Sequence, residues 1–450
     1  MNIFERAVGG RRYRIASQSL WDPARQRPFA RQAVLGPADA PPVADLGLTH
    51  TVGTRRVGDV GALLWIAEQL DLVKLIDQAC GLRGTKDGPT LGEMVLAVAV
   101  QRACAPAGKI HWASFLESCV ARVSCLPAAA FTGAQFHRLA GQVTDEQLEQ
   151  AQIGIARAAV RQFEVWADVL AFDTTNFETH IATTTPGELA RRGHAKSTRS
   201  DLRVVGRATL VSETGHVPLL HRTYPGNGSD QAVLASCLGA LGLLHDALDE
   251  GEGRTYPACR TLVRDGGSWS EQLELDLDVA GYYTLISLPL SHRASHLALE
   301  HAARRGAMER LGGTLGDVRA ARLGTLVGDL DRTLVVVESE ERLRGQKRGI
   351  AAALRKARVE LSKLERRAAS GRVGRESLES QVRKALQREH LSEFVEATVQ
   401  EQGGKVSLDW HVDAARRRRL ERTRLGRRVL CTDRHIWSTG RIVPSGASGT

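Results

Sequence analysis

The hydrophobic positions of the first third of the chain recur at the spacing of an α-helix. Segment 57–81 has apolar residues three and four positions apart and ends in a glycine, which is a common helix stop. Thr90 and Thr144 each stand three residues before a Glu or Gln, the pattern of a capping box at a helix start. The pattern therefore predicts a mainly helical block over residues 51–166.

From about residue 168 the pattern changes to short apolar runs and alternating positions, which are typical of β-strands. Ser229 is placed to cap a long apolar helix among them. We predict three strands, a helix, a strand, a helix and a strand, at residues 168–180, 201–215, 216–227, 229–248, 258–267, 268–281 and 282–289. This β-β-β-α-β-α-β order predicts an α/β sheet with helical cover.

Beyond residue 291 the chain is charged, and its apolar positions again follow a helical period. Segment 341–369 has leucine and isoleucine at heptad-like spacing, and a glycine-containing break separates it from a second amphipathic segment at 376–400. This favours either a helical hairpin within one chain or a short coiled coil between two chains. The last seven residues, which include Pro444 and two glycines, are predicted not to form a helix.

These patterns predict the fold class α/β, with a mixed sheet, a helical N-terminal domain and a helical, coiled-coil-like insert. They divide the chain into five parts. The parts are an irregular basic N-terminus with a linker, the helical domain, the α/β core, the helical insert, and a final strand with a tail, at residues 1–50, 51–166, 167–290, 291–428 and 429–450.

Composition restricts the class of protein. Of 450 residues, 42% are hydrophobic and 25% are charged, as in folded proteins. No run of about 18 apolar residues is present, which predicts no membrane-spanning helix, and the charged N-terminus is unlike a secretory signal. Seven cysteines without a C-x-x-C pair favour buried thiols in a reducing cytoplasm over a zinc site or disulfides. The net charge of +10 favours a polyanionic partner.

Two aspartates have positions that suggest chemistry. Asp173 follows an apolar run in the first predicted core strand, and Asp265 closes the apolar run of the fourth, before two glycines. An acid inside a strand is disfavoured, because aspartate has a low β-propensity and burying an unpaired charge costs free energy. Each aspartate could also simply form a turn or a cap. If the two strands are neighbours, both carboxylates meet at the crevice beside the strand ends. Hard oxygen ligands of this kind suit Mg²⁺ or Mn²⁺.

Three segments resemble the DDE transposases of bacterial insertion sequences. AFDTTNFE at 171–178 resembles the family's first-aspartate motif, 193–230 resembles its G-H-S-K … P-G-N-x-x-D segment, and 262–289 resembles its second-aspartate motif. The resemblance covers the predicted core. It implies an RNase H-like fold that cuts DNA strands and joins them, with two Mg²⁺ or Mn²⁺ ions. In that family Asp173 would contact both ions and Asp265 one.

The resemblance also implies the partners. They are double-stranded DNA, as the terminal inverted repeats of an insertion element and as target DNA, and a second copy of the chain in a homodimer. The helical domain is expected to bind the repeats. The expected location is the cytoplasm, at the nucleoid, without membrane attachment.

The third acid of the family, a glutamate on a helix after the last strand, has no counterpart here, because no glutamate follows Glu421. The sequence therefore predicts a chain that is truncated before its catalytic glutamate and is for that reason impaired in catalysis. Glu421 lies within an arginine run and is more simply the partner of its neighbours than a replacement. The alternative function is a non-catalytic DNA-binding transposase remnant or regulator.

Basic residues at three places are expected to contact DNA phosphates. A solvated helix face or a loop of mixed charge is the alternative explanation for each. They lie in the transposase-like segment 193–230, beside the second aspartate, and in the arginine run: Lys196, Arg199, Arg203, Arg264, Arg416, Arg417, Arg418 and Arg419.

Overall fold

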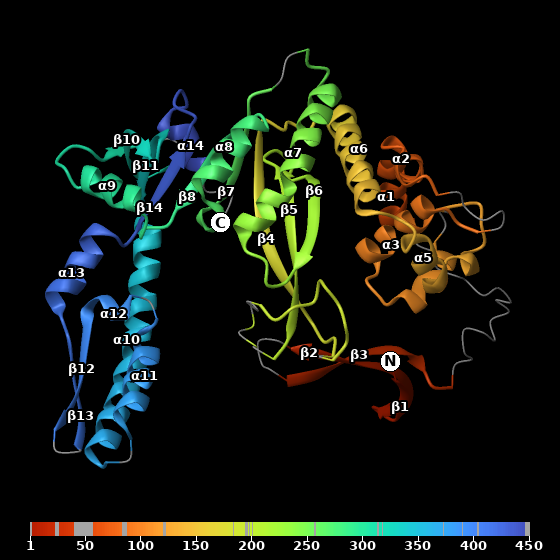
Figure 1. Ribbon diagram of the computed structural model, residues 1–450. Coiled ribbons are helices and arrows are strands. Elements are labelled where there is room, and N and C mark those ends of the chain that lie inside the picture. The colour runs from red at the N-terminus through yellow and green to blue at the C-terminus, as the bar shows by residue number, and fades with distance from the viewer. Residues whose placement is uncertain are drawn as a thin grey trace.

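A nine-stranded sheet forms the centre of the molecule (Figure 1). The computed structural model describes residues 2–445 except 23–26, 40–56, 83–87, 120–122, 183, 194–196, 198, 200, 256–257, 313–314, 317, 372, 389 and 403–404. The strand order is β6-β5-β4-β7-β8-β14-β11-β10-β9. The strands are β4 Val169–Thr179, β5 Arg203–Ser212, β6 Pro218–Pro225, β7 Arg260–Asp265, β8 Tyr282–Leu288, β9 Glu309–Arg310, β10 Arg319–Val327, β11 Leu330–Glu338 and β14 Arg427–Thr432.

The first half of this sheet has the element order that the sequence predicts. Strands β4, β5 and β6 form an antiparallel meander, and β7 and β8 then follow in parallel to β4. The helices between them are α7 (Asp230–Glu252), which Ser229 caps as predicted, and α8 (Glu271–Val279). The predicted order β-β-β-α-β-α-β is confirmed, and the chain is a mixed α/β protein.

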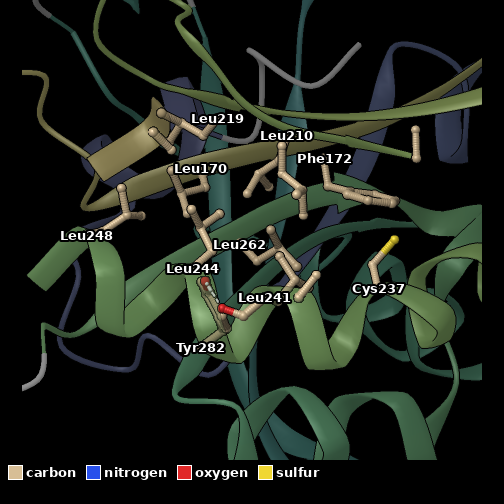
Figure 2. Close-up of a cluster of buried hydrophobic side chains, with 14 of the residues drawn as sticks. Leu170, Phe172, Leu210, Leu219, Cys237, Leu241, Leu244, Leu248, Leu262 and Tyr282 are labelled. Carbon is tan, nitrogen blue, oxygen red and sulfur yellow. Dashed lines mark hydrogen bonds between the residues drawn. The ribbon is translucent and has the colours of Figure 1, made fainter. Parts of the chain in front are cut away.

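Large aliphatic side chains fill the core between α7 and the sheet (Figure 2). Leu170 of β4 and Leu262 of β7 pack with Leu241 and Leu244 of α7, and all four are fully buried. Burying each leucine stabilises the fold by about 1.5–3 kcal/mol. By length and composition α7 could cross a membrane, but half of its most apolar window is buried inside the protein. We therefore assign α7 as the core helix of the sheet.

The second half of the sheet comes from the segment predicted to be a helical insert, 291–428, so that prediction is wrong in part. After α9 (Arg293–Ala302), strands β9, β10 and β11 extend the sheet, and β14 pairs between β8 and β11. The apolar stretch 334–337 of β11 is buried on both faces. A strand covered on both faces shows no alternation of polar and apolar residues, and its pattern is therefore easily taken for part of a helix.

The remainder of the insert is a long helical hairpin with a β-ribbon packed on it. Helix α10 (Glu340–Ala369) packs against α11 (Arg375–Leu386), and the apolar heptad positions are buried within the same chain. Of the two predicted arrangements, the structure has the hairpin. The second predicted helix ends at Leu386 rather than at 400, because alternating Val395, Ala397 and Val399 form a strand. The remaining elements are α12 Leu391–Phe394, β12 Val395–Gln402, β13 Lys405–Val412 and α13 Ala414–Thr423.

The N-terminus, predicted to be irregular, instead contains a three-stranded antiparallel sheet: β1 Asn2–Val8, β2 Arg11–Asp22 and β3 Arg27–Pro37. The prediction is wrong because it overlooked a turn. Gly9 and Gly10 both have positive φ, and Val8 pairs directly with Arg11. A two-residue turn with two positive φ values matches the twist of a β-hairpin, which makes Gly-Gly a hairpin signal. The predicted linker lies largely outside the described residues.

The segment that follows is helical, as predicted. Thr90 and Thr144 each form the expected capping box, with both reciprocal hydrogen bonds present. The elements are α1 Gly58–Gln69, α2 Leu72–Cys80, α3 Leu91–Cys104, α4 Trp112–Glu117, α5 Gly133–Ala140 and α6 Asp145–Phe163, with short 3₁₀ turns at η2 Lys109–His111 and η3 Ala128–Ala130.

The chain's last described element is a helix, α14 (Thr439–Ser445), which contains Pro444. The prediction that residues from 444 onward form no helix is therefore wrong for Pro444 and Ser445, while 446–450 lie outside the described residues. Packing outweighs the poor helix propensity of this segment. Ile442 and Val443 are buried against the sheet, on the face opposite α7.

Two positions in segment 193–230 require glycine, because the backbone of another part of the chain lies too close for a side chain. A Cβ on Gly193 would lie 2.0 Å from the carbonyl oxygen of Gly226, and a Cβ on Gly226 would lie 2.0 Å from that of Val204. The Gly226 amide also donates to the Leu189 carbonyl at 3.0 Å. The loop before β5 therefore crosses the end of β6 at a distance that excludes any side chain.

We expect Gly226→Ala to lower the free energy of unfolding by roughly 1–3 kcal/mol, because neighbouring backbone has to move to admit the methyl group. Gly239→Ala is the matched control, since Gly239 lies in α7 and an added Cβ meets nothing within 4 Å. Alanine is the better helix former, so this control should be neutral or stabilising. Urea denaturation midpoints compare the two variants. Equal midpoints would contradict the packing role of Gly226.

Candidate functional site

The two aspartates singled out in the sequence lie side by side in the sheet. Strands β4 and β7 are parallel neighbours, and their register pairs Phe172 with Arg264. Asp173 and Asp265 are the next residues on the two strands. Adjacent strands lie about 4.8 Å apart, and each aspartate directly follows a residue of the last pair in this register. The structure thus brings together the two acids that the sequence proposes as a pair.

Both aspartates also face the same side of the sheet. Val169 and Val263 pack in the core under α14, and the side chains of alternate residues share a face. Asp173 and Asp265 are separated from these valines by even numbers of residues, so they lie on the α14 face. Both are exposed. The pair therefore forms an accessible acidic site at the carboxyl end of β7.

The loop after β7 fixes Asp265. The Gly266 amide donates to Asp265 Oδ1 at 2.7 Å, and the Ser268 hydroxyl donates to the Asp265 carbonyl at 2.8 Å, which closes the 3₁₀ turn η4 (Gly266–Ser268). A Cβ on Gly266 would lie 2.2 Å from the Ser287 carbonyl oxygen, so glycine is required there. The aspartate is thereby a cap, as one of the two sequence interpretations proposes, and its carboxylate is held in a fixed position.

The charges of this pair are not neutralised by neighbouring cations. In the part of the chain that the structure describes, no ion pair involves Asp173 or Asp265. Two adjacent carboxylates repel each other, and a divalent cation relieves that repulsion. The donor set, two hard oxygen ligands open to solvent, fits Mg²⁺ or Mn²⁺.

A third carboxylate, which the sequence interpretation left without a role, contacts the residue next to Asp173 from the α7 side of the sheet. Asp230 is the last residue of the P-G-N-x-x-D-like segment and begins α7. Its Oδ1 accepts a hydrogen bond, at 2.8 Å, from the hydroxyl of Thr174, the residue that follows Asp173. Its Oδ2 would lie 2.9 Å from a Cβ on Gly267, two residues after Asp265. Spacing alone could not reveal this, because the contact depends on how α7 docks on the sheet.

A polar cavity of about 430 Å³ opens beside this third carboxylate, with Thr174, Tyr224 and Asp230 in its wall. Burial, and to a lesser degree the charges of Asp230 and Asp173, raises the pKa of Tyr224. Nevertheless, no group of three or more His, Cys, Asp or Glu placed to hold one metal ion occurs among the residues described. The site therefore consists of two adjacent carboxylates, with Asp230 fixed to Thr174.

Arg264, predicted to contact DNA, is a structural residue, and we correct that assignment. Its side chain is fully buried and forms an ion pair with Glu274, which is itself 1% exposed. Burial lowers the pKa of Arg264 to about 10. Glu274 also accepts hydrogen bonds from Thr284 at 2.6 Å and from Arg332 at 3.4 Å. A guanidinium held in this way does not reach a phosphate outside the protein.

Two other predicted contacts in segment 193–230, Arg199 and Arg203, lie around the far end of the β4–β5 hairpin. Arg199 pairs with Asp201, with Nε 3.0 Å from Oδ1, and both are exposed. Arg203 begins β5 and donates to the Thr185 carbonyl at 2.8 Å. Lys196 lies outside the described residues. The structure does not bring Arg199 or Arg203 to the aspartate pair.

The predicted arginine run forms α13, on the insert. Arg416 pairs with Glu396 at 2.6 Å, and Arg417 with Glu421 at 3.0 Å, while Arg418 and Arg419 are exposed. Glu421 also pairs with Lys347 of α10 at 3.2 Å, and these partners lower its pKa. Helix α13 lies apart from β4 in Figure 1, so Glu421 is not a third acid of the aspartate pair. Its role is the structural one that the sequence favours.

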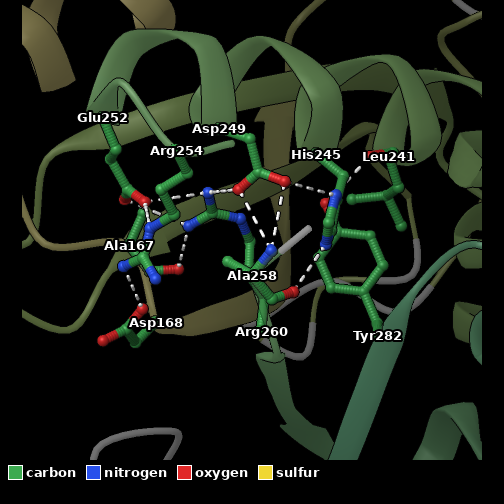
Figure 3. Close-up of polar contacts among 10 residues, drawn as sticks. All are labelled: Ala167, Asp168, Leu241, His245, Asp249, Glu252, Arg254, Ala258, Arg260 and Tyr282. Atoms are coloured by element: carbon green, nitrogen blue, oxygen red, sulfur yellow. Dashed lines mark hydrogen bonds and ion pairs between the residues drawn. The ribbon is translucent and has the colours of Figure 1, made fainter. Parts of the chain in front are cut away.

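Charges at the opposite ends of β4 and β7 are instead paired among themselves (Figure 3). Arg260, at the start of β7, has no exposed surface and contacts Asp249 at 2.5 Å and Glu252 at 3.1 Å. Arg254 pairs with Asp168 at 3.0 Å. These charges hold α7 to the strand starts. The contrast with the unpaired aspartates identifies the carboxyl edge as the candidate site.

Comparison with known proteins finds slight structural likenesses to two transposases. One is piggyBac transposase in a synaptic complex with hairpin DNA, at 12% identity and a TM-score of 0.25, covering 66% of this chain and 54% of that one. The other is Mos1 transposase in a paired-end complex with a left transposon end, at 11% identity and a TM-score of 0.18, covering 45% and 61%. This chain thus spans less than two thirds of either protein. No protein-family model and no curated protein matches it. We therefore interpret the site from its own residues.

Proposed function

We propose that the protein is a DDE-type transposase of a bacterial insertion element, which cuts and joins DNA strands with divalent cations. The observation that carries the proposal is the register that sets Asp173 beside Asp265 on one face of the sheet. The strand order β6-β5-β4-β7-β8 supports an RNase H-like core, as the sequence resemblance implies. The surplus of cations, +10 at neutral pH, supports DNA as the partner.

In this proposal the chain's own residues position the reacting groups. Asp173 and Asp265 would hold the cations, while η4 keeps the Asp265 carboxylate in place and Asp230 fixes the strand position after Asp173 through Thr174. Bound Mg²⁺ or Mn²⁺ supplies Lewis-acid stabilisation of the leaving oxygen and makes an attacking water or 3′-hydroxyl more acidic. No side-chain nucleophile is needed.

The partners proposed are the terminal inverted repeats, which the helical segment 51–166 would bind, and target DNA. A homodimer would hold two element ends, and the work would take place in the cytoplasm, at the nucleoid. Because the heptad positions of α10 are buried within the chain's own hairpin, a dimer would use another surface.

Nicking of a supercoiled plasmid tests the proposal. The purified chain, with two of the family's three acids, should convert supercoiled DNA to open circles at a reduced rate with Mn²⁺ or Mg²⁺ and should stop when EDTA removes the cation. The Asp173→Ala protein, purified identically, controls for contaminating nucleases and should leave the plasmid supercoiled. Equal nicking by both proteins would refute a catalytic role for the aspartate pair.

A second candidate function is binding of DNA without cleavage, as a transposase remnant or regulator. It is favoured by the finding that the described residues include no cluster of three metal-ligating side chains. Salt-sensitive binding of duplex DNA by a chain that never nicks, with either cation, would support this function over the first.

A further inference from the structure

A groove rich in basic residues runs along the hairpin formed by α10 and α11. Its volume is about 740 Å³. Small residues of α10, Ala353 and Ala357, leave room at its floor, and the cations along it are Arg355, Lys356, Lys384 and Arg388. All four are exposed. Cations from α10 and from the end of α11 face it, so the groove presents positive charge from both of its walls.

These four cations differ from others on the same helices because they are free. Within the described part of the chain, no ion pair or hydrogen bond involves any of the four side chains. Arg344, Lys363 and Arg375, also exposed, instead pair with glutamates at 2.5, 3.3 and 2.9 Å. The one acid in the groove, Glu360, is the partner of Lys363. The groove therefore keeps a net positive charge, which an external polyanion can use.

The hairpin leaves the sheet at the edge where the aspartate pair lies. Strand β14 is antiparallel to β8, and β11 is antiparallel to β14, so β11 runs parallel to β8, β7 and β4. Helix α10 follows β11 directly and starts at the carboxyl edge shared with β4 and β7. Figure 1 shows the hairpin extending away from that edge of the sheet.

We propose that this groove binds the phosphodiester backbone of double-stranded DNA on its way to or from the aspartate pair. The inference rests on the proposed function for the identity of the polyanion. Lys and Arg on two facing helices suit the repeated phosphates of a duplex. With a rise of about 1.5 Å per residue, Ala353 lies roughly 20 Å along α10, which is about six base pairs from the edge.

Salt-dependent DNA binding tests the groove without requiring cleavage. The probe is a fluorescent duplex of about 30 base pairs, roughly 100 Å long, which can span both sites. The test variant is K356Q/K384Q/R388Q. The matched control is R344Q/K363Q/R375Q, which removes the same charge from exposed, ion-paired positions of the same helices. Both variants alter only exposed side chains, and unchanged thermal melting shows that they fold.

For the groove variant we expect the slope of log affinity against log salt concentration to become shallower by roughly 2 to 3, close to one for each phosphate that the protein no longer neutralises. The control should keep the slope of the natural chain. An unchanged slope in the groove variant, or an equal change in the control, would overturn the proposal. It would also be overturned if the groove variant lost binding of polyglutamate but kept its binding of DNA. The binding measurement contains no metal and is independent of the nicking assay. A chain that binds DNA through the groove but never nicks it would therefore refute only the proposed function.

Discussion

Replacing Asp265 by asparagine is expected to lower the rate of metal-dependent DNA nicking by at least about 100-fold while leaving the fold intact. Loss of a residue that merely orients a metal ligand typically costs 10- to 100-fold, so loss of a charged ligand should cost at least the upper figure. Asparagine keeps an oxygen that can accept the Gly266 amide, now at 2.7 Å from Oδ1. It is also a good cap, so η4 should persist.

The matched control for this variant is Asp278→Asn, which neutralises an exposed aspartate of α8 away from the pair. Single-turnover nicking of supercoiled plasmid with Mn²⁺ gives the rates, and thermal melting verifies the fold. A normal nicking rate in Asp265→Asn, with normal melting, would show that the paired carboxylates do not support the chemistry. An equal loss in Asp278→Asn would point to net charge instead of metal binding.

The sequence could predict this acidic pair because the strand order of the core is a local pattern. Short apolar runs, glycine turns and capped helices specified β4 to β8, and parallel strands bring their carboxyl ends together. The exact register of β4 on β7 was not available from the sequence. It depends on how Leu170 and Leu262 pack under α7, which is a tertiary contact.

The wrong assignment of Arg264 had a local physical reason that the sequence already contained. Neighbouring residues of a strand face opposite sides of the sheet. If Asp265 reaches the α14 face, Arg264 has to point under α8, where Glu274 lies buried. The strands added by β9 to β11 are a different case. β10 and β11 pair as a hairpin, but they join the core strands only through β14, which follows the whole α10–α13 segment, and no local pattern specifies such a distant pairing.

The same buried pair gives the largest effect on stability that we expect. In Glu274→Gln, the charges of Arg264 and Arg332 lose their shared carboxylate at a site with almost no exposed surface. Removing one partner of a buried ion pair costs about 3–5 kcal/mol, since the remaining charge stays desolvated. For a domain of this size, the loss lowers the melting temperature by roughly 10 °C. Calorimetry measures the change.

A surface control and a double variant separate the buried charge from other causes. Glu250→Gln removes the partner of Arg157 at an exposed site, and its melting temperature should change by less than a few degrees. Arg264→Met combined with Glu274→Leu removes both charges, and we expect it to melt above Glu274→Gln because no unpaired guanidinium remains at position 264. If the double variant melts below the single one, the ion pair itself stabilises the sheet. In that case the cost of Glu274→Gln does not come from an uncompensated charge.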